Sequence, residues 1–311
     1  MKITALAGGV GGAKLVHGLA QILPPEDLTI IVNTGDDFEH FGLYICPDLD
    51  TVCYTLAGLA NPETGWGRAG ETWKAMDNLR RLGAPDWFNL GDSDLATHLE
   101  RTRRLKAGQT LTQITHDFCA AWGIHHTILP MSDQPVRTMV NTVEYGELPF
   151  QEYFVKYRCE PRVHGFRFAG AEIAEPAPGA REALQAADAV VICPSNPWVS
   201  IDPILNVLKL QPMSRPLPPV IAVSPIIGGR TVKGPAAKMF TELGIEPSAL
   251  AVAEHYRGLL RGFVLDTVDS SFQEAIRRLK IEPLVAGTIM QSTEDRRRLA
   301  EAVLHLVGKI L

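Results

Sequence analysis

Four aspartates lie within fifteen residues near the start of the chain. Asp36 and Asp37 follow an apolar run that is typical of a buried strand, and Asp48 and Asp50 come a dozen residues later. Such carboxylates repel one another unless a cation or hydrogen-bond donors compensate them, and carboxylates are ligands for hard cations such as Mg²⁺. The spacing favours magnesium together with phosphates. A plain turn after the strand and a helix cap at Asp50 are the alternatives.

A glycine-rich segment, Gly8-Gly9-Val10-Gly11-Gly12-Ala13-Lys14, follows the first apolar run, and we interpret it as a loop. Glycines let backbone N–H groups approach a phosphate, and the start of the next helix favours an anion. The dinucleotide-binding fingerprint fails because Lys14 stands where its third glycine belongs, and the P-loop fingerprint also fails. The segment therefore indicates a phosphate or nucleotide site without ATP hydrolysis or NAD binding. A tight turn without a ligand is the alternative.

Two later loops follow apolar runs in the second half of the chain. Ser195 and Asn196 stand between two prolines, which constrain the loop and direct polar groups outward. Ser224 begins a similar loop that reaches Gly228. Ser195 lacks clear histidine and acid partners, and Pro194 breaks the G-x-S-x-G elbow, so a serine hydrolase is not indicated.

A third polar segment runs from Asn89 to His98 and enters a predicted helix. It contains Asp92 and Asp94, and Ser93 or Asp94 could cap the helix. A lone histidine such as His98 is more often structural than catalytic. We interpret the nearby arginines as a solvated helix face; they are Arg101, Arg103 and Arg104.

The loops that carry these residues need a sheet to bring them together. Apolar runs at residues 3–6, 28–32, 189–193 and 220–223 predict its strands, and 263–265 could add another. Parallel strands end at one edge of an open α/β sheet, which is where such folds bind ligands. We therefore expect an α/β, Rossmann-like core of three layers with a mostly parallel sheet.

The middle of the chain differs from this pattern. Helical spacing at 72–82 and 95–106 is followed by strand-like alternation at 136–140 and 153–155. We interpret residues 66–168 as an inserted substrate-binding subdomain of mixed helices and strands over the carboxyl edge of the sheet.

This insertion divides the expected core into residues 1–65 and 169–311. The second part repeats the pattern of an apolar run, a constrained loop and a helix. The last helix should open at Ser292-Thr293-Glu294-Asp295, which matches a capping box.

Composition excludes several classes of protein. The 311 residues contain 30 Lys and Arg against 35 Asp and Glu, a net charge of −5 that provides no basic face for nucleic acid. No run approaches the roughly 18 apolar residues of a membrane-spanning helix. Five scattered cysteines without a C-x-x-C pair indicate neither a disulfide framework nor a thiolate zinc site. We expect a globular protein in a reducing cytoplasm.

Taken together, these segments resemble the 2-phospho-L-lactate transferases, a family of coenzyme F420 biosynthesis. The glycine segment, both aspartate pairs, Met131-Ser132-Asp133 and the later polar loops occur in the order seen in that family. The most specific segments are Cys46-Pro47-Asp48-Leu49-Asp50-Thr51 and Gly91-Asp92-Ser93-Asp94-Leu95-Ala96-Thr97-His98. The resemblance extends from the first strand to the last third of the chain.

The resemblance implies a magnesium-dependent transfer between two small molecules. The donor carries a lactyl or enolpyruvyl group joined through a diphosphate to guanosine. The terminal hydroxyl on the ribityl chain of the deazaflavin Fo attacks the phosphorus nearer the organic acid, and GMP leaves. Positioning and charge neutralisation account for most of such catalysis.

The resemblance also implies roles for individual residues. Asp50 should lie beside the ribityl chain as catalytic base, magnesium ligand or both, with Asp36, Asp37 and Asp48 as further metal ligands. The expected contacts to Fo are Asp50, Asn89, Asp92, Asp94 and His98. The expected nucleotide and phosphate contacts are Gly9, Val10, Gly11, Gly12, Lys14, Asn33, Ser195, Asn196, Ser224 and Gly228.

Two positions depart from the family pattern, and each departure removes a positive charge. Asn89 stands where some members carry a lysine that contacts Fo, and Ser93 stands where arginine is common. A sister family of regulatory proteins, which bind nucleotide sugars without catalysis, shares the glycine-rich start and the aspartate loop and is the alternative. A homodimer is the expected assembly. No residue distinguishes lactate from enolpyruvate on the donor.

Overall fold

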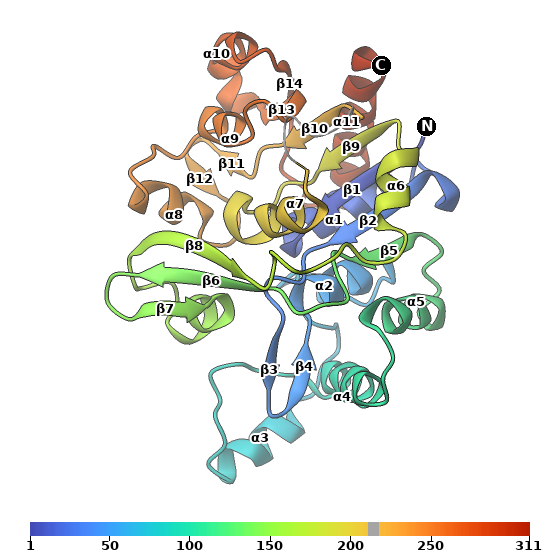
Figure 1. Ribbon diagram of the computed structural model, residues 1–311, viewed down its shortest axis with the longest axis vertical. Helices are drawn as coiled ribbons and strands as arrows, with labels where there is room; N and C mark the ends of the chain where they lie inside the picture. Colours follow the sequence, from blue (N-terminus) through green and yellow to red (C-terminus); the bar gives the residue numbers. More distant parts are fainter. Residues whose placement is uncertain (211–217) are drawn as a thin grey trace.

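The computed structural model describes residues 1–210 and 218–311 and shows a three-layer α/β fold, Rossmann-like as predicted (Figure 1). Its described residues include a parallel sheet of seven strands. In sheet order these are β14 (Glu282–Ala286), β13 (Leu260–Asp266), β10 (Val220–Val223), β9 (Ala189–Ile192), β1 (Ile3–Ala7), β2 (Leu28–Val32) and β5 (Thr127–Pro130). The predicted strands at 3–6, 28–32, 189–193, 220–223 and 263–265 are thus confirmed.

The strand order has a switch point between β1 and β9. From β1 the chain adds β2 and β5 on one side, and it then returns to add β9, β10, β13 and β14 on the other. Ala5 at the centre of β1 is in register with Ile30 of β2 and with Val191 of β9. Ligands bind at such a switch in open α/β sheets, so the loops after β1 and β9 are well placed for binding.

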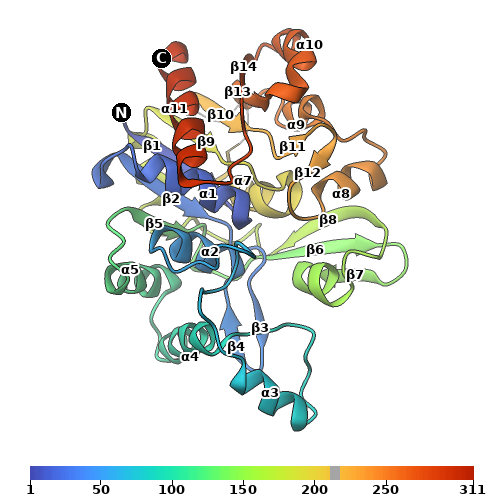
Figure 2. The same cartoon turned by 180° about the vertical axis from the view of Figure 1, so that it is seen from behind.

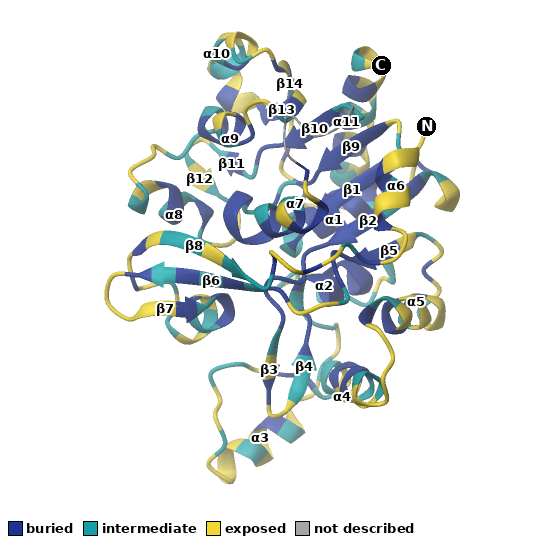
Figure 3. Ribbon diagram, in the orientation of Figure 1, coloured by how far each residue is buried: buried dark blue, intermediate teal, exposed yellow. Residues whose placement is uncertain are grey.

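Helices cover both faces of the sheet (Figures 1 and 2). Neighbouring strand residues such as Ile30 and Ile31 pack into separate apolar clusters, one on each face, which explains the continuous apolar runs. One face packs against α1 (Gly9–Ala20), α2 (Pro47–Leu56), α5 (Leu111–Ala121) and α11 (Thr293–Ile310). The other packs against α6 (Ala180–Ala186), α7 (Asp202–Leu208), α8 (Ala236–Glu242), α9 (Ala249–His255) and α10 (Gln273–Arg278). The central strands β1, β9 and β10 are accordingly buried throughout, whereas only one of the five residues of the edge strand β14 is buried (Figure 3).

The middle of the chain adds helices and a second sheet beside the core. The β3–β4 hairpin and α3 extend away from the central sheet, and β6 pairs with β7 on one side and with β8 on the other (Figure 1). The bounds are β3 (Phe38–His40), β4 (Leu43–Ile45), α3 (Lys74–Arg81), α4 (Asp92–Lys106), β6 (Arg137–Thr142), β7 (Gly146–Pro149) and β8 (Val163–Ala169). Strand β5 also lies within residues 66–168 but pairs with β2 in the central sheet. The division into core and inserted subdomain stays a prediction.

Two local predictions are wrong. Residues 153–155 do not form a strand, because Glu152–Lys156 is a π-helical turn, η2. Phe150 and Tyr153 are three residues apart and both buried, whereas Phe154 is 38% exposed, so the spacing is helical. The glycine segment is also not a loop beyond Gly8, since its other residues form the first turns of α1.

The remaining elements are short. They are η1 (Pro25–Asp27), η3 (Pro197–Ile201), η4 (Thr267–Phe272), β11 (Ile226–Ile227) and β12 (Arg230–Thr231). The capping box at the start of α11 is confirmed, because Ser292 and Asp295 each accept the other's backbone N–H. None of the helices in the described residues combines the length and apolar composition needed to span a membrane.

Candidate active site

A cavity of about 910 Å³ opens where β1, β9 and β10 end, and residues from α2 and α4 also line it. Most of the expected site residues line this cavity. They are Gly9, Val10, Gly11, Lys14, Asp36, Asp48, Asp50, Asn89, Asp94, His98, Ser195, Asn196 and Ser224. The others lie outside its lining, and their contacts are described below: Gly12, Asn33, Asp37, Asp92 and Gly228.

The glycine segment and the loop after β9 touch at the switch point. The Gly8 N–H donates to Ser195 Oγ at 3.2 Å, and this hydroxyl donates back to the Gly8 carbonyl at 2.8 Å. A Cβ atom at Gly11 would collide with the Pro194 carbonyl oxygen, and one at Gly12 would lie 2.9 Å from Ser195 Oγ. The close approach of two backbones therefore requires glycine here, while the start of α1 stays open to the cavity.

Asp48 supports the glycine segment from α2. Its Oδ1 accepts the Gly9 N–H at 2.8 Å, and its Oδ2 accepts Asn33 Nδ2 at 2.9 Å. Asn33 also donates to the Val199 carbonyl at 3.2 Å and accepts the Gly35 N–H at 2.8 Å. Burial raises the pKa of Asp48 to about 6, against the hydrogen bonds from Asn33 and Gly9. These hydrogen bonds hold the loops in place. A metal role for Asp48 and a nucleotide contact for Asn33 stay predictions.

Two lysines line the same end of the cavity. Lys14 Nζ donates to the Met290 carbonyl at 2.7 Å, and burial, followed by the charges of Arg296 and Lys233, lowers its pKa. Lys233 Nζ donates to the Thr64 carbonyl. Both ammonium groups are thus held at the cavity wall by neutral carbonyls, which leaves their charge available to an anion.

The other phosphate candidates shape their own loops. Asn196 accepts backbone N–H groups at the start of η3, and the Ser224 hydroxyl donates within its own turn at 2.7 Å. The Gly228 N–H donates to Asp269 at 3.0 Å, so that donor is already used. Asn196 and Ser224 line the cavity on rigid loops, whereas Gly228 has a contact that stabilises its turn.

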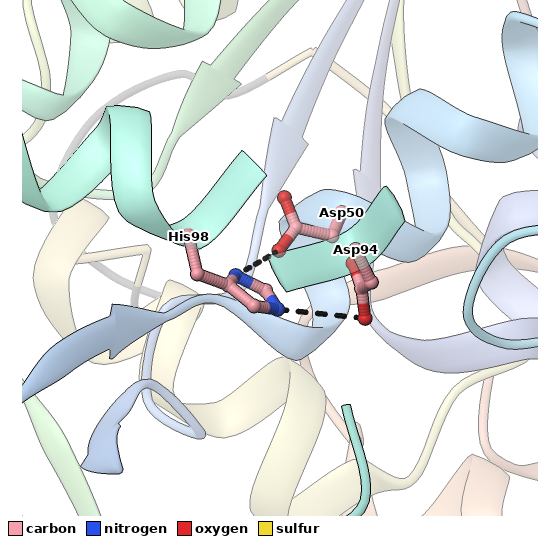
Figure 4. A group of neighbouring side chains, drawn as sticks. All are labelled: Asp50, Asp94 and His98. Carbon is pink, nitrogen blue, oxygen red and sulfur yellow. Dashed lines mark ion pairs between the residues drawn. The ribbon is translucent and has the colours of Figure 1, made fainter. Parts of the chain in front are cut away.

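Asp50, Asp94 and His98 line another part of the cavity and form a charged cluster. Figure 4 shows their side chains. Asp50 comes from α2, and Asp94 and His98 lie four residues apart on one face of α4. His98 Nδ1 is 3.7 Å from Asp50 Oδ2, and His98 Nε2 is 3.4 Å from Asp94 Oδ2. One ligand atom from each residue lies within 4.8 Å of the others, so the three could hold a metal ion.

Arg101 lies behind this cluster. Its Nη1 donates to Asp50 Oδ2 at 3.0 Å, its Nη2 donates to Asp50 Oδ1, and Nη1 lies 3.2 Å from His98 Nδ1. Burial raises the pKa of Asp50, and Arg101 and His98 oppose that change. Burial alone would also raise the pKa of Asp94, but the contacts with His98 and Tyr54 outweigh it and lower that pKa. The contacts within the cluster thus outweigh the effect of burial on the pKa of Asp94, whereas at Asp50 they offset it only in part.

The prediction of a solvated arginine face is wrong for Arg101, which is 1% exposed. Arg101 follows His98 by three residues and therefore shares the buried face of α4. The spacing of Asp94, His98 and Arg101 along one helix face was a signal that sequence reasoning missed. Arg103 and Arg104 do pair with Glu100 near the surface, at 2.7 and 2.8 Å.

The paired aspartates after β2 differ in their surroundings. Asp36 lines the main cavity, and burial, followed by the Asp48 charge, raises its pKa well above its usual value. Asp37 lines an adjoining cavity of about 290 Å³, and burial raises its pKa to about 7 although Arg137 opposes the change. Among the described residues, Asp36 Oδ1 and both Asp37 oxygens have no hydrogen-bond partner.

The expected metal set of Asp36, Asp37, Asp48 and Asp50 does not form one group in the described residues. The group whose donor atoms converge is instead Asp50 with Asp94 and His98. The reason is that Asp48 turns toward Gly9 and Asn33, while Asp37 lines the adjoining cavity. The metal roles of Asp36, Asp37 and Asp48 stay predictions.

Asp92 has a structural contact instead of facing the cavity. Its carboxylate accepts two backbone N–H groups in the first turn of α3, at 3.0 and 3.1 Å. In return, the Glu71 carboxylate accepts the N–H groups of Ser93 and Asp94 at 2.7 and 2.8 Å. This reciprocal capping fixes the start of α4, which carries Asp94 and His98. Nothing in the local sequence marks Glu71 for this role, so sequence reasoning missed it.

Asn89 lines the cavity and accepts a hydrogen bond from Arg80 of α3. The Arg80 guanidinium therefore lies beside Asn89, the position at which some members of the family carry a lysine. The same guanidinium pairs with Asp77 at 3.0 Å and does not line the cavity, so its charge is already partnered within its own region.

Comparison with known proteins shows the family to which the chain belongs. A family model described as 2-phospho-L-lactate transferase CofD matches residues 3–301. A protein from Streptomyces griseus named phosphoenolpyruvate transferase is 43% identical over 100% of this chain and 99% of its own length. Proteins of that name from Thermobifida fusca and Mycolicibacterium smegmatis are 43% and 40% identical, over 98% and 99% of both chains.

A solved structure of a UPF0052-family protein from Bacillus halodurans has a TM-score of 0.59 at 12% identity and covers 97% of this chain and 98% of its own. A second structure from the same organism has a TM-score of 0.62 at 13% identity, covering 97% and 99%. At these identities the likeness shows the fold alone. On the whole-chain matches, this protein is a transferase that belongs to the 2-phospho-L-lactate transferase family.

Proposed function

We propose that the protein transfers a phospholactyl or enolpyruvyl phosphate group from a guanosine diphosphate-linked donor to the deazaflavin Fo, releasing GMP, in coenzyme F420 biosynthesis. The proposal rests on one observation: the residues suited to bind the donor diphosphate and the residues suited to activate the acceptor hydroxyl line the same cavity. The start of α1 and two lysines lie at one part of its wall, and the Asp50–Asp94–His98 cluster lies at another. Such a cavity can hold a diphosphate and an attacking hydroxyl at the same time.

The enolpyruvyl donor is the better supported of the two. The family model bears the name of the phospholactate enzyme, but relatives that match the full chain at 40–43% identity are named phosphoenolpyruvate transferases. We therefore expect faster turnover with the enolpyruvyl donor.

In this proposal, the part of the cavity wall formed by the start of α1, Lys14 and Lys233 binds and orients the donor. A helix N-terminus attracts anions through its free N–H groups and its dipole, and α1 begins directly at the cavity. Lys14 and Lys233 add positive charge there. Ser195, Asn196 and Ser224 line the same cavity on loops that are already ordered by hydrogen bonds, so little entropy is lost when the nucleotide binds.

The charged cluster activates the acceptor. The ribityl hydroxyl oxygen forms a bond to the phosphorus nearer the organic acid, and the bond from that phosphorus to the bridging oxygen breaks, so GMP leaves with the electron pair. Asp50 accepts the hydroxyl proton, since its carboxylate lines the cavity beside Asp94 and His98. His98 and Asp94 orient the hydroxyl beside it.

The residues present fit a magnesium ion. Mg²⁺ usually takes one or two protein carboxylates and completes its shell with waters and substrate phosphates. Asp50 and Asp94 would hold it, because each carboxylate oxygen keeps a lone pair beyond its present contact. Asp36 is a further candidate, since one of its oxygens is buried without a partner among the described residues. When bound, the ion would neutralise diphosphate charge and stabilise the leaving phosphate.

The test is GMP release by the purified protein. We expect release only when Fo, a guanosine diphosphate-linked donor and Mg²⁺ are all present, loss of release with EDTA, and recovery with added Mg²⁺. Parallel reactions with the lactyl and enolpyruvyl donors compare the acids. Absence of GMP with both donors, together with tight binding of a nucleotide sugar, would replace this proposal with the regulatory function.

A further inference from the structure

We propose that Arg101 is a positioning residue that fixes the orientation of the Asp50 carboxylate at the cavity wall. This inference rests on the proposed transfer reaction and assigns to it a residue that does not itself line the cavity. Arg101 would act on the reaction through Asp50 rather than by contact with either substrate.

The geometry of the pair carries the inference. Arg101 is 1% exposed, and its two Nη atoms contact the two oxygens of Asp50. Such a two-point contact between planar groups fixes the rotation of the carboxylate as well as its position. Nη1 also donates to the Tyr44 carbonyl at 3.3 Å and lies 3.2 Å from His98 Nδ1. The guanidinium is therefore itself held on several sides.

The pair also connects two elements that are far apart in the sequence. Asp50 stands in the first turns of α2, and Arg101 stands on α4, 51 residues later. Asp94 and His98 lie on the same helix as Arg101. The contact thus joins Asp50 to the helix that carries the other two members of the cluster.

Stability alone is a weak explanation for this pair. Burying a guanidinium and a carboxylate costs desolvation free energy, and well-packed apolar residues often replace such pairs without loss. Orientation of the cavity-lining carboxylate explains the two-point contact better, because catalysis is sensitive to small misplacements of a reacting group.

The test compares Arg101→Lys and Arg101→Gln with Arg104→Lys. Arg104 lies on the same helix but pairs with Glu100 and Asp117 near the surface, so it is the matched control. Lysine keeps the buried charge but cannot make the two-point contact. We expect kcat of Arg101→Lys to fall about 10²-fold, the typical cost of misplacing a reacting group by about 1 Å. KM for the guanosine donor and GDP affinity measured by calorimetry should stay within a few-fold of wild type.

We expect Arg101→Gln to lose more activity than Arg101→Lys, and Arg104→Lys to resemble wild type. Unchanged kcat in Arg101→Lys would overturn the inference. Failure of both Arg101 variants to fold, or parallel losses in kcat, donor KM and GDP affinity, would also overturn it in favour of a structural role.

A crystal structure of Arg101→Lys gives a readout that does not depend on turnover. The Asp50 carboxylate should be rotated or displaced while the glycine segment stays in place. An unchanged Asp50 would overturn the inference even if the wild-type protein is active. If the wild type releases no GMP, the proposed function fails instead, and the position of Asp50 in this crystal structure still decides whether Arg101 orients it.

Discussion

The two parts of the cavity to which we assign roles are built in opposite ways; we call them the phosphate end, at the start of α1, and the charged end, at Asp50, Asp94 and His98. At the phosphate end, backbones approach each other at glycines, and the main contacts are hydrogen bonds from N–H groups and hydroxyls, as between Gly8 and Ser195. At the charged end, side chains from α2 and α4 bring buried ions together, with Asp50 between Arg101 and His98. The structure of the phosphate end depends on close backbone packing beside the sheet. The structure of the charged end depends on opposite charges that come from elements far apart in the sequence.

This difference determines how each end should respond to change. A site formed by closely packed backbones has no room for an added atom, so a larger side chain there should disturb it. A compensated ion cluster has its volume filled by side chains, so it is sensitive to the loss of one charge, which leaves the partner buried without compensation. Substitutions that alter only size or only charge can therefore separate the two ends.

The largest effect is expected for Asp50→Asn, which keeps the size and removes the charge. GMP release should fall by about 10²–10⁴-fold, as for the loss of a general base. The buried Arg101 would lose its anion, so the free energy of unfolding should also fall, by about 3 kcal/mol. Turnover assays and urea unfolding measure the two effects.

The matched control is Asp117→Asn, since Asp117 pairs with Arg104 of the same helix but its side chain is 47% exposed. Surface pairs contribute about 0–1 kcal/mol, so both activity and stability should stay close to wild type. Equal losses in the two variants would show that the charged end is no more sensitive to charge than the protein surface.

The next effect is expected for Gly11→Ala, which adds one methyl group at the phosphate end without a charge. The new Cβ would collide with the Pro194 carbonyl oxygen, and two backbones would have to separate. We expect a loss of about 1–3 kcal/mol in stability and a higher KM for the guanosine donor, with a smaller change in kcat than for Asp50→Asn.

The control for Gly11→Ala is Gly308→Ala in α11, where an added Cβ would have no heavy atom within 4 Å. Alanine favours the helix, so this variant should be unchanged or gain up to about 1 kcal/mol. A Gly11→Ala protein as stable and as tightly binding as Gly308→Ala would contradict the close approach at the switch point.

The same contrast explains what could be predicted from the sequence. The strand beside the glycine segment follows from a local pattern, because the apolar run at residues 3–6 predicts β1, whereas the loop expected after it is limited to Gly8 and the other glycines start α1. Residues 28–32 and 189–193 were recognisable as strands for the same reason, since strands buried on both faces are continuously apolar. These signals require no knowledge of distant residues.

The charged end could be predicted only in part. Asp50 and Asp94 were identified through their motifs, but the spacing that places Arg101 on the same helix face as Asp94 and His98 was missed, and its pairing with Asp50 does not follow from the sequence until the position of Asp50 is known. That position depends on how α2 and α4 pack, and their contact joins residues 51 apart. Likewise, the aromatic and β-branched segment 153–155 fits a strand in isolation, and only the burial of Phe150 with Tyr153 decides for the helical turn.

The smallest effect is expected for Asp92→Ala, which tests where the charged end stops. Asp92 and Asp94 are two residues apart, yet Asp92 caps α3 and only Asp94 lines the cavity. Loss of a capping carboxylate should cost about 1 kcal/mol of stability, with kcat within a few-fold of wild type. Asp94→Ala should instead lower kcat strongly, because it removes a carboxylate from the cluster. A larger fall in kcat for Asp92→Ala than for Asp94→Ala would return Asp92 to the acceptor site and move the boundary of the charged end outward, to the start of α4.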